Sequence, residues 1–193
     1  MKPFALEKPK RTGVLQSVTT LEDKLEFDEV AFSSIEAEST DLEKISIIDS
    51  TLDKCNFSAA KVNESLFQRV KITDSRMSGI IWYDAILKDI EIVNCKIDLA
   101  NFRATKFKNV IFKDCVLNGS DWQGATLTNV KFDNCTLDDM DVNNCIMSNV
   151  DLRSSTFVGL QGLNGLAGAT LSRSQLITLA PIFANELGIK IED

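Results

Sequence analysis

Cysteine is the residue type in this chain with the widest chemical repertoire, because a thiolate can attack a substrate, bind a metal or form a disulfide. The chain has five cysteines and no histidine. It therefore lacks the Cys-His and Ser-His pairs of nucleophilic catalysis. No C-x-x-C pair is present either, so a zinc site is not expected. The cysteines are separated by multiples of five residues: Cys55, Cys95, Cys115, Cys135 and Cys145.

Other signatures of catalysis are also missing from the sequence. No G-x-x-x-x-G-K-[ST] or G-x-G-x-x-G segment is present to hold the phosphates of a nucleotide. The carboxylates are spread along the chain instead of converging on one segment. We therefore predict no catalytic residue, no cofactor and no bound metal, and we expect that the protein is not an enzyme.

The spacing of the cysteines belongs to a pattern of period five that runs from Leu25 to Phe157 without an insertion. An apolar residue returns at every fifth position, as at Phe102, Phe107 and Phe112, and a mostly small or β-branched residue stands two positions before it. This period suits neither a helix nor a flat strand, and a fixed period is typical of a solenoid. All five cysteines occupy the second kind of position, so we expect them to be buried, reduced and inert.

Individual segments of this pattern resemble the A(D/N)LXX repeat of the pentapeptide-repeat proteins. Examples are Ala-Asn-Phe-Arg-Ala at 100–104 and Ala-Thr-Leu-Thr-Asn at 125–129. The resemblance implies an all-β solenoid, a right-handed quadrilateral β-helix in which four repeats make one turn of about twenty residues. Positions twenty apart then stack in columns at roughly 4.8 Å. The sequence supports this turn length, because Val70, Ile90 and Val110 share one column and Cys95, Cys115 and Cys135 share another.

The chain divides into three predicted parts, with a tail and cap at residues 1–24, the coil at 25–171 and a C-terminal segment at 172–193. The first residues are basic and read as a mobile tail, in which Leu15, Val18 and Leu21 fold over the first turn. Glycines and leucines alternate after Phe157 and predict a tight last turn. The segment 169–171 looks like one more repeat, displaced by one residue.

The last part of the chain has the pattern of a helix. Ser172 and Gln175 form a capping box at its start, and Gly188 is placed as its left-handed stop. Pro181 should kink or divide the helix near residues 179–180, and residues 189–191 read as a short strand.

The apolar face of this helix can cap the coil, or cap it and also contact a second copy. We predict a homodimer, because that face exceeds what one capped turn needs. The candidate interface residues are Leu176, Leu179, Phe183, Leu187, Ile189 and Ile191.

The net charge of −7 argues against direct binding of nucleic acid. No run of eighteen apolar residues is present, so no membrane span is expected. The N-terminus lacks an apolar signal core, which favours a cytoplasmic protein.

The charges are distributed unevenly over the four faces of the predicted coil. The two faces centred on the Phe57 and Leu42 columns carry eleven acids and five bases, whereas those centred on Leu52 and Phe67 carry eleven acids and nine bases. On the balanced faces we expect Lys71 to pair with Glu91, and Asp133 to stack between Lys113 and Arg153. The acids of the other faces either bind turn backbone or form a negative stripe for a basic partner. The candidates are Asp84, Asp121, Asp138, Asp139 and Asp141.

These observations favour a non-catalytic, protein-interaction solenoid of unknown partner. An alternative comes from the quinolone-resistance branch of the family, which this chain resembles in its coil, its acidic surface and its ending from Gln175 to Leu187-Gly188-Ile189. That resemblance implies a homodimer that mimics DNA and binds DNA gyrase or topoisomerase IV.

Overall fold

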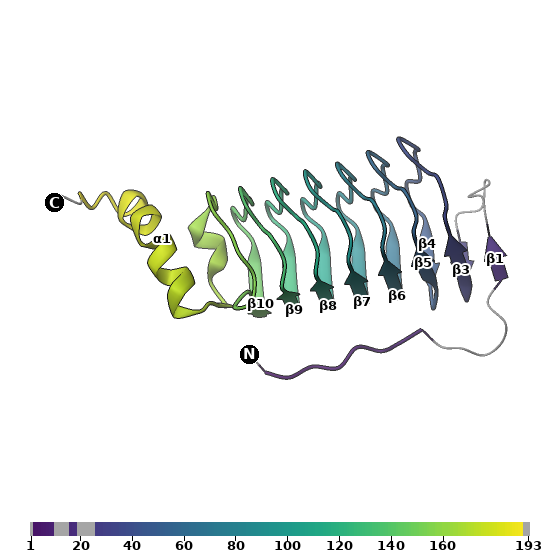
Figure 1. The fold of residues 1–193 in the computed structure, drawn as a ribbon, viewed down its shortest axis with the longest axis horizontal. Helices are drawn as coiled ribbons and strands as arrows, with labels where there is room; N and C mark the ends of the chain where they lie inside the picture. The colour runs from purple at the N-terminus through teal and green to yellow at the C-terminus, as the bar shows by residue number, and fades with distance from the viewer. Residues whose placement is uncertain (1, 10–15, 19–25, 191–193) are drawn as a thin grey trace.

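The chain winds into a stack of parallel strands, shown in Figure 1 as a series of similar turns along one axis. The structure is a computed structural model, and it describes residues 2–9, 16–18 and 26–190. The strands are β1 (Gln16–Val18), β2 (Glu26–Asp28), β3 (Val30–Ser33), β4 (Ser46–Ile48), β5 (Thr51–Asp53), β6 (Leu66–Thr73), β7 (Ile86–Val93), β8 (Lys106–Lys113), β9 (Thr126–Asp133), β10 (Ile146–Asp151) and β11 (Ala169–Thr170). A 3₁₀ helix, η1 (Leu163–Leu166), precedes β11, and the helix α1 (Arg173–Glu186) follows it.

The register of these strands confirms the predicted turn of twenty residues. Val70 pairs with Ile90, and Ile90 pairs with Val110, each one turn further along the chain. The last strand differs, because Val150 pairs with Ala169 at an offset of nineteen residues. The displaced final repeat predicted at 169–171 is therefore present, and the fold is the expected quadrilateral β-helix.

The interior is filled by the residues of the five-residue pattern. The large apolar side chains are buried from Phe27 to Phe157, except Leu42, which is partly buried and packs against the core. Aromatic rings stack between turns, with Phe112 and Phe132 at 5.0 Å and nearly parallel. Burying each such side chain contributes roughly 2 kcal/mol before conformational entropy is counted.

The four sides of the coil are of two kinds. The strands β6 to β9 each run over two adjacent sides, which carry the Phe67 and Leu52 columns and which we call the stranded faces. The other two sides, which we call the turn-built faces, consist of turns joined by single bridges, as in residues 75–85, 95–105, 115–125 and 135–145. From Glu29 to Asn149 every fifth residue takes a left-handed conformation at a corner. Many of these residues are Asp or Asn, which are enriched in this conformation.

The C-terminal helix begins and ends as the sequence predicts, but it is not divided. Ser172 and Gln175 form both hydrogen bonds of the capping box. Gly188 is left-handed at φ 69°, and Ile189 N donates to Ala184 O at 2.8 Å to close the helix. Pro181 lies inside one continuous helix, so of the predicted kink or division the division does not occur. Ile189 and Lys190 form no strand, and Ile191 lies outside the described residues.

The N-terminal part contacts the coil in two places. Strand β1 adds to the first turn, where Gln16 pairs with Val30, so the backbone of residues 16–18 covers this end of the coil. Leu15 and Leu21 lie outside the described residues. Residues 2–9 run back along the strands toward β10 (Figure 1), where Lys2 N donates to Asn149 Oδ1 at 2.6 Å. The predicted mobile tail therefore lies against the coil, because polar side chains at one corner bind its backbone.

Candidate functional site

The turn-built faces are the candidate site, since they are the two faces with eleven acids and only five bases. Asp84 and Asp139 are exposed on these faces. Both stand at left-handed corners, with φ of 51° and 55°. Their carboxylates are therefore accessible to a partner approaching this side of the coil.

The other three candidate acids are half-buried and bind backbone groups. Asp121 and Asp141 are stacked directly, one turn apart. Asp121 Oδ1 accepts from Gln123 N at 3.0 Å, and Asp141 Oδ1 accepts from Asn143 N at 2.9 Å.

Asp138 Oδ1 likewise accepts from Val158 N at 2.9 Å. Asp121 Oδ2 also lies 2.9 Å from Arg103 Nε. These three carboxylates therefore stabilise the turns, as the first of the two sequence-based interpretations expects, and one of them is also neutralised.

Ion pairs form on both kinds of face, and on the turn-built side Lys44 contacts Glu64 at 3.7 Å. The stranded faces differ because they carry nine bases for their eleven acids. Lys71 and Glu91 form the expected ion pair at 3.0 Å.

Asp133 lies in register with Lys113 as predicted, but its ion pair is with Lys131 at 3.0 Å. Arg153 binds Asp151 instead, through two 2.9 Å hydrogen bonds. Lys131 and Asp133 are two apart in β9 and therefore point to the same side of the strand. Arg153 lies in the turn after β10 and binds the last residue of that strand. The hydrogen bonds hold the pKa values of Asp133 and Asp151 below their usual range.

The five thiols are buried and unpaired, which confirms their expected place in the interior. The Cys145 thiol donates to Trp122 O at 3.0 Å. Burial raises the pKa of Cys145 to about 12. A thiol that stays protonated is a poor nucleophile and a poor metal ligand.

The helix α1 is fixed to the coil by one buried polar side chain. Gln175 Nε2 donates to Leu152 O at 2.6 Å and to Ser155 O at 2.7 Å. The Leu179 side chain is 1% exposed and covers the core, and Phe183 packs beside it. These two candidate interface residues therefore serve the cap.

Other residues of the C-terminal segment remain exposed. Leu176, Leu187 and Ile189 are 54%, 73% and 57% exposed. Ile177, which the sequence analysis did not select, is 74% exposed. No helix among the described residues is both long and apolar enough to cross a membrane.

The comparison with protein families is decisive for the identity of the coil. A family model described as "Pentapeptide repeat region" matches residues 25–102 and 93–161. The chain belongs to the pentapeptide-repeat family. No curated protein matches the chain in sequence.

Solved structures of other pentapeptide-repeat proteins are similar to this chain at low identity. Full-length QnrB1, a plasmid-mediated fluoroquinolone resistance protein, is 17% identical, with 85% of this chain and 90% of that chain covered and a TM-score of 0.34. HetL, a protein involved in heterocyst differentiation regulation from the cyanobacterium Nostoc, is 11% identical over 68% and 84%, with a TM-score of 0.32. A pentapeptide repeat protein from the thylakoid lumen of Arabidopsis thaliana is 16% identical over 76% and 78%, with a TM-score of 0.27.

This pentapeptide coil has a second polar feature, at the corner where the two stranded faces meet. We call it the corner ladder, and it consists of Asp89, Asn109, Asn129 and Asn149. Each amide donates to the residue one turn before it, with Asn109 Nδ2 to Asp89 Oδ1 at 2.8 Å and Asn149 Nδ2 to Asn129 Oδ1 at 2.7 Å. All four residues are left-handed.

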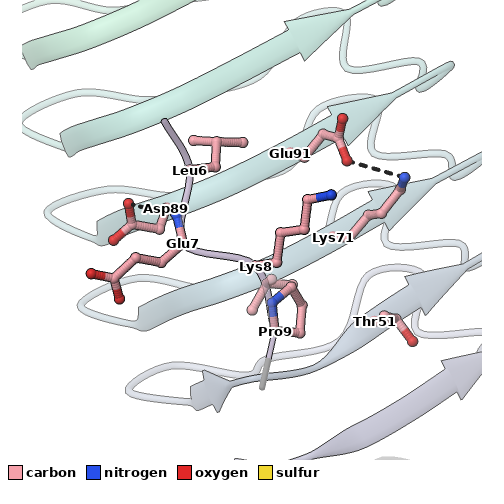
Figure 2. A pocket seen from close by; sticks show the side chains of 9 residues that line it. Leu6, Glu7, Lys8, Pro9, Thr51, Lys71, Asp89 and Glu91 are labelled. Carbon is pink, nitrogen blue, oxygen red and sulfur yellow. Dashed lines mark hydrogen bonds and ion pairs between the residues drawn. The ribbon is translucent and has the colours of Figure 1, made fainter. Parts of the chain in front are cut away.

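The tail lies along this ladder. Asn149 Nδ2 donates to Lys2 O at 3.0 Å, so Asn149 binds both backbone groups of Lys2. Further along, Glu7 N lies 3.5 Å from Asp89 Oδ1. Between tail and coil is a groove of about 510 Å³, lined in part by Leu6, Lys8 and Lys71 (Figure 2).

Sequence reasoning missed the corner ladder, although the signal was present. Its residues are spaced by twenty, and three of them are asparagine. Sequence reasoning also assigned Gln175 only to the start of the helix. The two hydrogen bonds from Gln175 to the coil were not predicted, because they depend on how α1 lies over the last turn.

Proposed function

We propose that this protein is a non-catalytic interaction solenoid that binds the basic surface of a protein partner through its turn-built faces. The observation that carries the proposal is the excess of acids on these two faces, with Asp84 and Asp139 exposed. The interior is filled by apolar side chains, so recognition falls to the outer surface. Attraction between exposed charges weakens with salt, because screening is strong beyond about 8 Å at physiological ionic strength.

Charge reversal of two acids on the turn-built faces, compared with charge reversal of two acids on the stranded faces, tests this proposal. Asp84→Lys with Asp139→Lys should abolish capture of the partner from an extract of the host cell. The matched control is Asp74→Lys with Asp114→Lys, which changes two exposed, left-handed acids that border the stranded faces. Lysine already occupies this left-handed conformation at Lys44 and Lys54, so the backbone should tolerate it at all four sites. The control also removes the hydrogen bonds that Asp74 and Asp114 accept from Asn94 and Asn134, so the folding of both double variants is checked first. Equal loss of capture in both double variants would argue against a role for the turn-built faces.

The second candidate function is that of a DNA mimic that binds DNA gyrase or topoisomerase IV in the cytoplasm. The stacking of Asp121 and Asp141 favours it, since it repeats a carboxylate at the spacing of one turn. A supercoiling assay with purified gyrase tests it. Inhibition or protection from quinolones should appear with the native protein and disappear with Asp84→Lys and Asp139→Lys. An unchanged reaction at micromolar protein would leave the general scaffold as the function.

We also propose a homodimer formed through the exposed residues of the C-terminal segment. Leu176 and Leu187 are suited to this role because the cap does not bury them. Light scattering on the full chain should give the mass of a dimer, and Leu176→Lys with Leu187→Lys should give that of a monomer. A monomeric native chain at micromolar concentration would overturn this assignment.

A further inference from the structure

The corner ladder binds its occupant mainly through the backbone. Asn149 contacts the N–H and the C=O of Lys2, as the edge of a strand would. A side-chain amide has two N–H donors, and Asn109 and Asn129 each use one of them within the ladder. Such a surface suits an extended segment and makes little demand on its side chains.

At the Asp89 end of the corner ladder, the N-terminal tail does not supply the hydrogen-bond donor that the site lacks. Asp89 is 2% exposed, and its Oδ2 has no hydrogen-bond partner among the described residues. A buried acceptor without a donor is costly. The tail places another acid beside it, and Figure 2 shows the Glu7 and Asp89 side chains on the same side of the tail. A donor is therefore missing where the chain supplies Glu7.

The neighbouring cation is already engaged. Arg69 binds Asp49 through two hydrogen bonds of 2.6 Å, and its contact with Glu7 is longer, at 4.0 Å. The Lys8 side chain points to the other side of the tail, away from Asp89 (Figure 2). On the coil side the groove is lined by Thr51, Lys71 and Glu91, which stay in place when the tail leaves.

We propose that the corner ladder is a docking site for an extended segment of a partner protein that carries Arg or Lys where this chain has Glu7. Residues 2–9 are a weaker occupant that such a segment displaces. The cationic side chain donates to Asp89 Oδ2, while the backbone of the segment takes the place of the tail on the ladder. This site lies on the stranded side of the coil and does not depend on the acidic, turn-built faces.

A first test gives the chain's own tail the cationic side chain that the proposal requires. In the full chain, Glu7→Arg should slow the hydrogen exchange of residues 2–9 by about tenfold, because a charge-assisted hydrogen bond is gained. Glu7→Gln is the control that removes the acid without adding a cation, and it should give a smaller change. The gain of Glu7→Arg should vanish when Asp89→Asn is added.

The variant Asp89→Asn is expected to fold. Asparagine occupies the equivalent positions Asn109, Asn129 and Asn149 in the same conformation. Exchange of residues 2–9 that is as fast in Glu7→Arg as in Glu7→Gln would overturn the proposal. A slowing that persists with Asp89→Asn would also overturn it.

A second test uses a separate segment. Two labelled peptides with the sequence of residues 2–9, one native and one with Glu7→Arg, are titrated with the full chain and followed by fluorescence anisotropy. The arginine peptide should bind about tenfold more tightly and should accelerate exchange of the chain's own residues 2–9. Asp89→Asn should remove its advantage. Equal binding of both peptides, or an advantage that survives Asp89→Asn, would contradict the proposal.

Discussion

The stranded and turn-built faces are made from the same repeat, yet they present different surfaces. Each pair carries eleven acids, but the stranded pair has nine bases and the turn-built pair five. On the stranded side, Asp151 and Asp133 bind cations, and the N-terminal tail lies along the corner. On the turn-built side, Asp84 and Asp139 are exposed. The number of acids therefore says little about a surface until the position of the bases is known.

Both halves surround one interior, and breaking this shared core should have the largest effect. Phe112 is fully buried, stacks on Phe132 at 5.0 Å and touches Trp122 from the turn-built side. Phe112→Ala should lower the free energy of unfolding by about 3–5 kcal/mol, as measured by denaturant unfolding. Cys115→Ala is the control and should cost less than about 1.5 kcal/mol, because alanine fills similar positions elsewhere. Similar losses for both would mean that the interior is loosely packed.

A polar contact inside the turn-built half should have the next largest effect. Trp122 Nε1 donates to Ser120 Oγ at 2.7 Å, and both residues are buried. Ser120→Ala should cost about 1–3 kcal/mol, because a buried donor loses its acceptor. The exposed Ser148 of β10 offers a control, and Ser148→Ala should stay within about 0.5 kcal/mol. An unchanged midpoint for Ser120→Ala would show that Trp122 does not need this partner. Trp82 is an example of a buried indole without such a partner, since its Nε1 has no hydrogen-bond acceptor among the described residues.

An ion pair on the stranded half should have a smaller, pH-dependent effect. The hydrogen bonds from Arg153 lower the pKa of Asp151 in the folded state. A lowered pKa contributes stability above the ordinary pKa of aspartate, and this is lost as the pH falls through the folded value. Asp151→Asn should therefore cost about 0.5–1 kcal/mol at neutral pH, since half-exposed pairs are weak. The difference in the free energy of unfolding between the variant and the native protein should disappear in acid. A difference that is constant with pH would exclude the ion pair as its cause.

The smallest effect on stability is expected from an exposed acid of the turn-built half. Asp139→Asn should change the free energy of unfolding by less than about 0.5 kcal/mol, because asparagine accepts the left-handed corner. The same variant should weaken capture of a basic partner. A destabilisation as large as that of Asp151→Asn would remove the contrast between the two halves.

The sequence was sufficient for features that repeat or that depend on neighbours in the chain. The columns at twenty residues, the displaced strand at Ala169 and the capping box of Ser172 all follow from local pattern. Features set by placement in space were not predicted. Asp133 had two cations within reach in its column, and only the side-chain geometry shows that Lys131 binds it. The path of residues 2–9 depends on amides that lie far away in the sequence.

The cap that α1 forms over the last turn limits the number of turns in the stack. The end of a parallel coil presents free strand edges, and two unlike ends could join copies head to tail into an open fibre. Gln175 occupies the carbonyls of Leu152 and Ser155, and Leu179 covers the apolar interior behind them. Gln175 and Leu179 thus block the addition of another coil at this end. The stack of turns therefore stops here instead of continuing into a second copy of the chain.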